Sequence, residues 1–218
     1  MTCRVRMLAA FAPSTHPSRP RDESPPSPGA ALRLHSRGAP GRREVEAFVR
    51  AVYRERFDAD VRHFAPMLVS LADADGSLLA AAGYRPADDE PLFLERYLER
   101  PVHEHLARPG APAVPRHRLV EVGHLAASRA GAGRVLIALL GAHLAGAGFQ
   151  WVVGTLTQEL RHLFVRLGIA PVALGVADPA LLGDEAAAWG TYYDHRPVVL
   201  AGNLELALQA LARRRSAA

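Results

Sequence analysis

Residues 118–134 bring together a carboxylate, an imidazole and a glycine-rich turn. Glu121 and His124 lie in an apolar stretch that predicts a strand over 118–126, and Gly131 and Gly133 follow at the start of an apolar helix. A glycine turn that opens a helix presents free backbone N–H groups to a phosphate and lets the ligand approach closely. The order therefore favours a phosphate-binding turn, with a plain turn into a helix as the alternative.

Glu121 is the candidate general base. A carboxylate on a central strand that faces a cleft is partly dehydrated, and this raises its proton affinity toward neutrality. It could then accept a proton from a bound nucleophile directly or through water. Arg85 and His124 could orient the base or the carboxylate of an acceptor. The structural alternative for Glu121 is an ion pair with Arg118 or Arg85.

Other kinds of chemistry are excluded by the residues present. The chain has no lysine, so lysine general bases, Schiff bases and the Walker phosphate lysine are absent. Cys3 is the single cysteine, and no Gly-x-Ser-x-Gly motif occurs. His103 and His105 invite a metal site, but residues two apart on a helix point to nearly opposite faces. We therefore predict no metal site and no covalent intermediate.

The charge is distributed unevenly along the chain. The formal net charge is +4, yet eight arginines lie in residues 1–43 and three in 213–215, which leaves 15 arginines against 20 acids in residues 44–212. A nucleic-acid-binding domain normally carries the opposite sign, so we expect no nucleic acid partner. The basic ends could contact an anionic membrane surface or be solvated tails. One cysteine and no apolar stretch of about 20 residues predict a cytoplasmic protein.

The pattern of apolar residues predicts a short leader and one α/β domain. Residues 1–40 are rich in proline and arginine and predict a disordered leader, although residues 31–35 could add an edge strand. Residues 41–218 form the domain, with strands and helices that imply a mixed central sheet flanked by helices and joined by parallel crossovers. The predicted helices are 44–57, 92–106 with a break at Pro101, 131–147, 158–167 and 204–214, and the predicted strands are 64–71, 78–84, 118–126, 150–156, 170–176 and 192–201.

The glycine turn resembles a known motif. Ser128-Arg-Ala-Gly131-Ala-Gly133 is similar to the Arg-x-x-Gly-x-Gly pyrophosphate loop of the N-acetyltransferase (GNAT) superfamily, with serine in the first position and Arg129 next to it. Phe164 stands where that family has its general-acid tyrosine. The resemblance implies a GNAT-like acyl-CoA N-acyltransferase fold. It assigns these residues to the thioester donor: Ala126, Ala127, Arg129, Gly131, Ala132, Gly133 and Arg134, with backbone N–H groups near the two alanines facing the thioester carbonyl.

Two narrower resemblances cover most of the domain. Glu121-Val-Gly-His124-Leu-Ala is similar to the Glu-x-x-Arg-Leu-Ala strand of acyl-homoserine-lactone synthases, with histidine in place of arginine. Segments of residues 41–205 together resemble the thermostable hemolysin family: 64–68, 82–85, 92–98, 120–126, 149–153 and 189–193. The hemolysin name describes a lytic phenotype, and the chain has no segment typical of a pore former.

These resemblances imply an N-acyltransferase. The donor would be an acyl-CoA or acyl-carrier-protein thioester, the acceptor a small amine such as an amino acid, and no cofactor would be tightly bound. Thr155 and Thr157 could contact the acyl chain, although strand threonines are common. Trp189, Tyr192 and Tyr193 could line an acyl tunnel or pack in the core, and both tyrosines are candidate general acids. The alternatives are a membrane-active hemolysin without turnover and a module that only binds acyl thioesters; an oligomer is compatible with the sheet edges of this fold.

Overall fold

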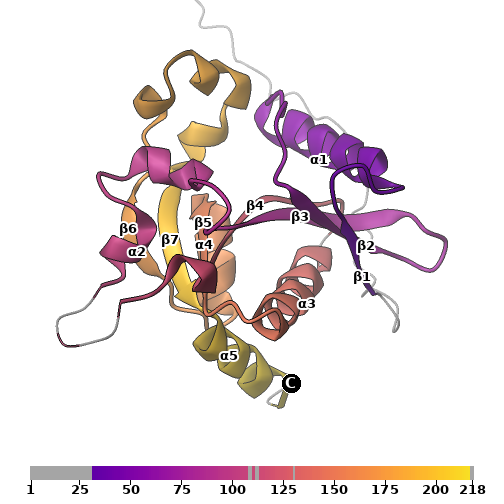
Figure 1. Cartoon of the computed structure of the whole chain (residues 1–218). Coiled ribbons are helices and arrows are strands. Elements are labelled where there is room, and N and C mark those ends of the chain that lie inside the picture. The colour runs from indigo at the N-terminus through magenta and orange to yellow at the C-terminus, as the bar shows by residue number, and fades with distance from the viewer. Residues whose placement is uncertain (1–30, 108–109, 111–112, 130, 217–218) are drawn as a thin grey trace, which may run out of the picture.

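The computed structural model describes residues 31–107, 110, 113–129 and 131–216. The part of the predicted leader before residue 31 lies outside this range. The described chain forms one seven-stranded sheet in the order β1-β2-β3-β4-β5-β7-β6 (Figure 1). The strands are β1 (Leu32–His35), β2 (Met67–Ala72), β3 (Leu78–Pro86), β4 (Leu119–Ala127), β5 (Trp151–Leu156), β6 (Val172–Val176) and β7 (Val198–Asn203).

Helices cover both faces of the sheet, and the alternation of side chains along the strands determines which face each one covers. In β2, Leu68 packs with α1 (Arg42–Phe57), whereas Val69 and Leu71 pack with α3 (Ala132–Gly146). Successive residues of a strand point to opposite faces, so α1 and α3 lie on opposite sides, as Figure 1 shows. The remaining helices are α2 (Val102–His105), α4 (Gln158–Arg166), α5 (Leu204–Ser216) and the 3-10 segments η1 (Phe93–Tyr97), η2 (Arg116–Arg118), η3 (Pro179–Trp189) and η4 (Tyr192–His195).

Strands β4 and β5 separate in the middle of the sheet. They pair in parallel over three residues each, Leu119–Glu121 with Trp151–Val153, and no further. A β-carbon on Gly154 would lie 2.8 Å from the carbonyl oxygen of Val122, so glycine allows the close approach at the point of divergence. Beyond this point the facing edges of the two strands have no sheet partner, and a ligand with its own hydrogen-bonding groups can enter there.

A bulge in β4 lies next to this separation. The register between β3 and β4 shifts between Ala81 and Gly83, and His124 adopts a left-handed backbone with φ of 54°. Such a conformation is strained for a residue with a β-carbon. The bulge bends β4 away from β5, because the extra residue lengthens only one edge of the strand pair.

Three sequence-based expectations are corrected by the structure. The predicted strand over 192–201 begins six residues later, at Val198, because Tyr192–His195 form η4, Arg196 has a φ of 49° and Pro197 lacks a backbone donor. The predicted helix over 92–106 is the short η1 followed by α2, separated at Pro101. The expected parallel crossovers reduce to one, between β4 and β5, and the other strand pairs are antiparallel.

The end of α1 is joined to the segment between η3 and η4. The N–H of Thr191 donates to the carbonyl of Phe57 at 2.7 Å, and the N–H of Asp60 donates to the carbonyl of Ala188 at 2.7 Å. Gly190 lies between them, where a β-carbon would come within 2.1 Å of the Phe57 oxygen. Glycine is therefore required for this close approach.

We expect Gly190→Ala to destabilise the fold by about 3 kcal/mol or more, because steric overlap adds to backbone strain. Gly183→Ala is the matched control. The two glycines have nearly the same dihedral angles, φ 51° and ψ −126° for Gly190 and φ 58° and ψ −134° for Gly183, but a β-carbon on Gly183 meets nothing within 4 Å. The control should lose only the backbone-strain cost that both positions share, about 1–3 kcal/mol, and therefore less than Gly190→Ala. Urea unfolding of both variants measures the difference. Equal losses of stability would contradict the steric requirement for glycine at residue 190.

Candidate active site

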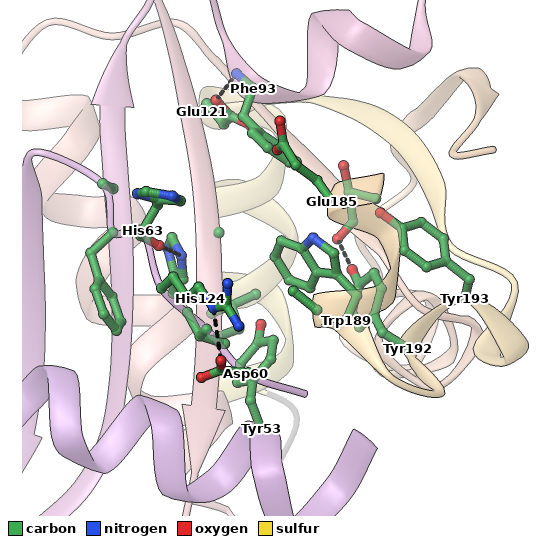
Figure 2. A pocket seen from close by; sticks show the side chains of 18 of the residues that line it. Tyr53, Asp60, His63, Phe93, Glu121, His124, Glu185, Trp189, Tyr192 and Tyr193 are labelled. Carbon is green, nitrogen blue, oxygen red and sulfur yellow. Dashed lines mark hydrogen bonds and ion pairs between the residues drawn. The ribbon is translucent and has the colours of Figure 1, made fainter. Parts of the chain in front are cut away.

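A cavity of about 610 Å³ lies on the α1 face of the sheet, beside the divergence of β4 and β5. Its walls are β4, residues 60–65, η1 and residues 184–193. Figure 2 shows His63 and His124 on one side, Trp189 and Glu185 on the other, and Glu121 beside Phe93 at one end. Seven of the sequence-predicted residues line it: Arg85, Glu121, His124, Thr155, Trp189, Tyr192 and Tyr193.

Glu121 is held by the backbone at the start of η1. Its Oε2 accepts from the N–H of Phe93 at 2.8 Å and its Oε1 from the N–H of Leu94 at 3.1 Å. Burial raises the pKa of Glu121, and these two hydrogen bonds offset part of that increase. The carboxylate therefore combines a fixed position with a proton affinity above that of an ordinary glutamate, as a general base at near-neutral pH requires.

The alternative ion pair of Glu121 is not formed in the described chain. Arg85 lies opposite Glu121 in the β3–β4 register, but its Nε pairs with Glu90 at 3.2 Å. Arg118 donates to the carbonyl of Gly148 at 2.8 Å. Arg85 still lies close enough for its positive charge to act against the rise in the pKa of Glu121.

His124 is a half-buried neutral imidazole. Its Nε2 lies 3.1 Å from the carbonyl oxygen of His63, and since a carbonyl can only accept, Nε2 carries the proton. Its Nδ1 faces Gly83, where a β-carbon would lie 3.0 Å away, and has no hydrogen-bond partner in the described chain. Burial lowers the pKa of His124 from 6.5 to about 4. The imidazole thus fixes residue 63 at the cavity wall as a neutral group.

A second carboxylate, Glu95, supports the same wall and was not identified from the sequence. It accepts from the N–H groups of Leu92 at 3.0 Å and Val102 at 2.9 Å, and from both terminal nitrogens of Arg116 at 2.7 and 3.2 Å. Burial acts to raise the pKa of Glu95, but the bonds from Arg116 and the backbone hold it below the ordinary value. Glu95 therefore stays ionised. It does not line the cavity, but it joins η1 to α2 and to Arg116.

Aromatic side chains form the wall opposite β4. The hydroxyls of Tyr97 and Tyr193 lie 2.6 Å apart, and Tyr192 donates to the carbonyl of Thr155 at 3.0 Å. Burial raises the pKa of Tyr193 and, more strongly, that of Tyr192. The hydroxyl proton of Tyr192 is therefore used in a hydrogen bond to β5. Tyr193 is the better placed of the two candidate acids.

The glycine turn lies at the N-terminus of α3. Gly131 is the N-cap with a φ of 86°, and no side chain caps the first turn in the described chain, so N–H groups of that turn can bind an anion. Arg134 is exposed beside them. Arg129 pairs with Asp73 at 3.0 Å, and Ser128 donates to the carbonyl of Leu79 at 3.1 Å, so both are attached to the β2–β3 hairpin.

Thr157 is separated from the other predicted residues. It is buried and is the N-cap of α4, where its hydroxyl oxygen accepts from the N–H of Leu160 at 3.5 Å. It does not line the cavity, whereas Thr155 does. The pattern Thr157-Gln-Glu could have predicted this capping role.

An apolar crevice of about 90 Å³ lies on the other face of the sheet, between α3, α4 and α5. Val122 and Leu125 of β4 line both this crevice and the cavity on the α1 face. The two spaces therefore approach each other where β4 and β5 diverge. In the part of the chain that the structure describes, no group of three or more His, Cys, Asp and Glu could hold a metal ion, and no helix is long and apolar enough to span a membrane.

The comparisons with known proteins agree with this geometry. The family model for thermostable hemolysin matches residues 35–208. No curated protein matches the sequence. Among solved structures, a CoA-dependent acyl-homoserine lactone synthase, BjaI, with SAM and isopentyl-CoA has 15% identity and a TM-score of 0.58 over 86% of this chain and 90% of its own.

Two further solved structures share the fold. FeeM, an N-acyl amino acid synthase from uncultured soil microbes, has 13% identity and a TM-score of 0.57 over 82% of this chain and 93% of its own. TofI in an apo form has 20% identity and a TM-score of 0.56 over 84% of this chain and 96% of its own. The expected GNAT-like fold with a mixed sheet is confirmed by these matches.

The half-buried neutral His124 predicts a pH dependence of stability. The pKa of His124 in the folded protein, about 4, lies below its value of 6.5 in the unfolded chain. The contribution of neutral His124 to folding stability is therefore complete above pH 6.5 and is lost as the pH falls toward 4. His124→Asn keeps a donor for the His63 carbonyl and tolerates the left-handed backbone. We expect the difference in unfolding free energy between wild type and variant to shift by about 2 kcal/mol over this range. A pH-independent difference in urea unfolding would contradict the assignment.

Proposed function

Because the chain belongs to the thermostable hemolysin family, and because its half-buried Glu121 faces the cavity where β4 and β5 separate, we propose that it is an acyltransferase. It transfers an acyl group from a thioester to a small amine. The single observation that carries this proposal is a carboxylate with a raised pKa, fixed by two backbone N–H groups beside an opening between parallel strands.

The thioester donor lies between the diverging strands. Its pantetheine arm can bond to the strand edges that have no sheet partner, and a pyrophosphate would bind at Gly131, Ala132, Gly133 and Arg134 on the first turn of α3. Backbone N–H groups near Ala126 and Ala127 stabilise the oxyanion. The apolar crevice beyond Val122 and Leu125 accommodates the acyl chain. Acyl-CoA and acyl carrier protein both supply this arm, and no cofactor is bound tightly.

The amine acceptor occupies the cavity on the α1 face. Its nitrogen attacks the thioester carbonyl carbon, a C–N bond forms, and the C–S bond breaks with release of a thiolate. Glu121 accepts the proton that the amine loses, and that proton passes to the thiolate or to solvent. Arg85 pairs with Glu90 through Nε and donates from Nη1 to the carbonyl of Pro91 at 3.5 Å, and its Nη2 can bind a carboxylate on the acceptor, which favours an amino acid or a related metabolite.

Removing the carboxylate of Glu121 is the first test of the base. We expect Glu121→Gln to lower kcat/KM for thiol release from acyl-CoA with pooled amines at least about a hundredfold. In the wild type, kcat/KM should rise with pH through a pKa above the ordinary glutamate value, and this rise should be absent in the variant, because the raised pKa belongs to Glu121.

Glu95→Gln is the matched control for Glu121→Gln. Both carboxylates accept from backbone N–H groups that hold η1, but only Glu121 lines the cavity. The control should keep the pH profile and lose less than about tenfold in kcat/KM. If both variants lose kcat/KM equally and the pH profile of Glu121→Gln is unchanged, Glu121 has only a structural role in holding η1. Two results together would favour the alternative of a membrane-active protein. They are lysis of red cells by Glu121→Gln protein, and no turnover of any CoA or carrier-bound donor by the wild type.

A second prediction concerns the glycine turn. Arg134→Ala should raise KM roughly tenfold for acyl-CoA and leave KM for acyl-pantetheine unchanged, because only the former carries a pyrophosphate. Arg43→Ala removes another exposed guanidinium, on α1, and should change neither value. A similar rise in KM for both donors would place the pyrophosphate elsewhere.

A further inference from the structure

Most of the exposed large apolar side chains of the described chain come from its last third. Of the six in the described chain, Leu34 lies on β1, and the other five come from residues 165–206: Val165, Val172, Val176, Leu181 and Leu206. Val165 and Leu206 are 68% and 64% exposed. β6 is the last strand of the sheet and carries no charged residue, so its free edge is not protected in the usual way.

Two of these side chains come from helices that line the apolar crevice. Phe164 of α4 and Ala207 of α5 line the crevice, and their chain neighbours Val165 and Leu206 are exposed. The two helices are also close to one another. A β-carbon on Gly168, just after α4, would lie 3.8 Å from the β-carbon of Ala210 on α5.

Arginines accompany these apolar side chains. Arg166 at the end of α4 and Arg213 and Arg214 near the end of α5 are exposed, and none forms an ion pair within the described residues. The acid of α5, Glu205, accepts from Gln209 at 3.3 Å in the first half of the helix. We name this surface of α4 and α5 the basic apolar face: Val165, Arg166, Leu206, Arg213 and Arg214.

We propose that the basic apolar face docks the protein on an anionic phospholipid bilayer. Exposed aliphatic side chains enter the boundary between headgroups and acyl chains, and the arginines attract the lipid phosphates. The contact is peripheral, and the two helices that carry the face, α4 and α5, also line the crevice.

Charge and position favour the bilayer over two other occupants. A symmetric second copy would bring the same arginines together, and like charges oppose such an interface. An acidic carrier protein has to deliver its pantetheine arm where β4 and β5 diverge. Helix α5 begins at the other end of β5, where the N–H of Leu204 donates to the carbonyl of Gln150 at 2.9 Å. The basic apolar face is therefore free for lipid while the donor site is occupied.

Co-sedimentation with vesicles tests the proposal. The full chain should bind vesicles of phosphatidylcholine and phosphatidylglycerol, and bind vesicles of phosphatidylcholine alone much more weakly. Arg213→Gln with Arg214→Gln should lower the partition coefficient roughly fivefold for each arginine removed. Val165→Asp with Leu206→Asp should lower it about tenfold or more, since both apolar contacts are lost. Thermal unfolding of each variant checks that it is folded.

Matched substitutions on the β1 side are the controls. Leu34→Asp replaces the sixth exposed apolar residue, which is 46% exposed, and Arg33→Gln with Arg37→Gln removes two exposed arginines near the N-terminal segment. These variants should bind like the wild type. The proposal is overturned if they lose as much binding as the variants of the face, if no vesicle binds the wild type, or if sedimentation shows a dimer that Val165→Asp dissociates.

Discussion

The separation of β4 from β5 after three paired residues is the constraint on which the rest of the site depends. Two neighbouring parallel strands normally stay paired, because each unpaired backbone group near the core loses a hydrogen bond. Here the bulge at His124 bends one strand, and Gly154 permits close approach where the pairing ends. The opening thus exists because two local features of the backbone coincide, and every candidate residue for chemistry is placed relative to it.

The η1 wall of the cavity depends on two carboxylates that accept from backbone N–H groups. Glu121 holds the start of η1 from β4, and Glu95, within η1, binds the N–H of Val102 in α2; their proton affinities change in opposite directions. The difference arises from their neighbours. Glu95 receives a bidentate guanidinium, whereas Glu121 receives only neutral donors and a more distant Arg85. Two glutamates in one small region are therefore suited to different tasks, one structural and one chemical.

Local patterns in the sequence predict most of the sheet and part of the site. The strand with Glu121, the glycine turn and α3 are found where apolar periodicity and turn residues indicate them. Glu95 was missed because its partners Val102 and Arg116 lie 7 and 21 residues away, in other elements, and no spacing rule connects them. Thr157 was assigned to the site because it ends a strand, but the same position begins a helix. The strand over 192–201 was placed too early because apolar content cannot show that Pro197 interrupts it.

The hydrogen-bonded contact between Thr191 and Phe57 has a consequence for how the cavity forms. The two residues are 134 positions apart, so closing that contact requires a large loss of chain entropy before the contact contributes any stability. Contacts of such high sequence separation form late in folding. During synthesis, α1 and the first strands leave the ribosome well before residues 188–191, so the nascent chain carries Glu121 without a closed cavity around it. The cavity therefore closes only after the last third of the chain has folded back onto the first.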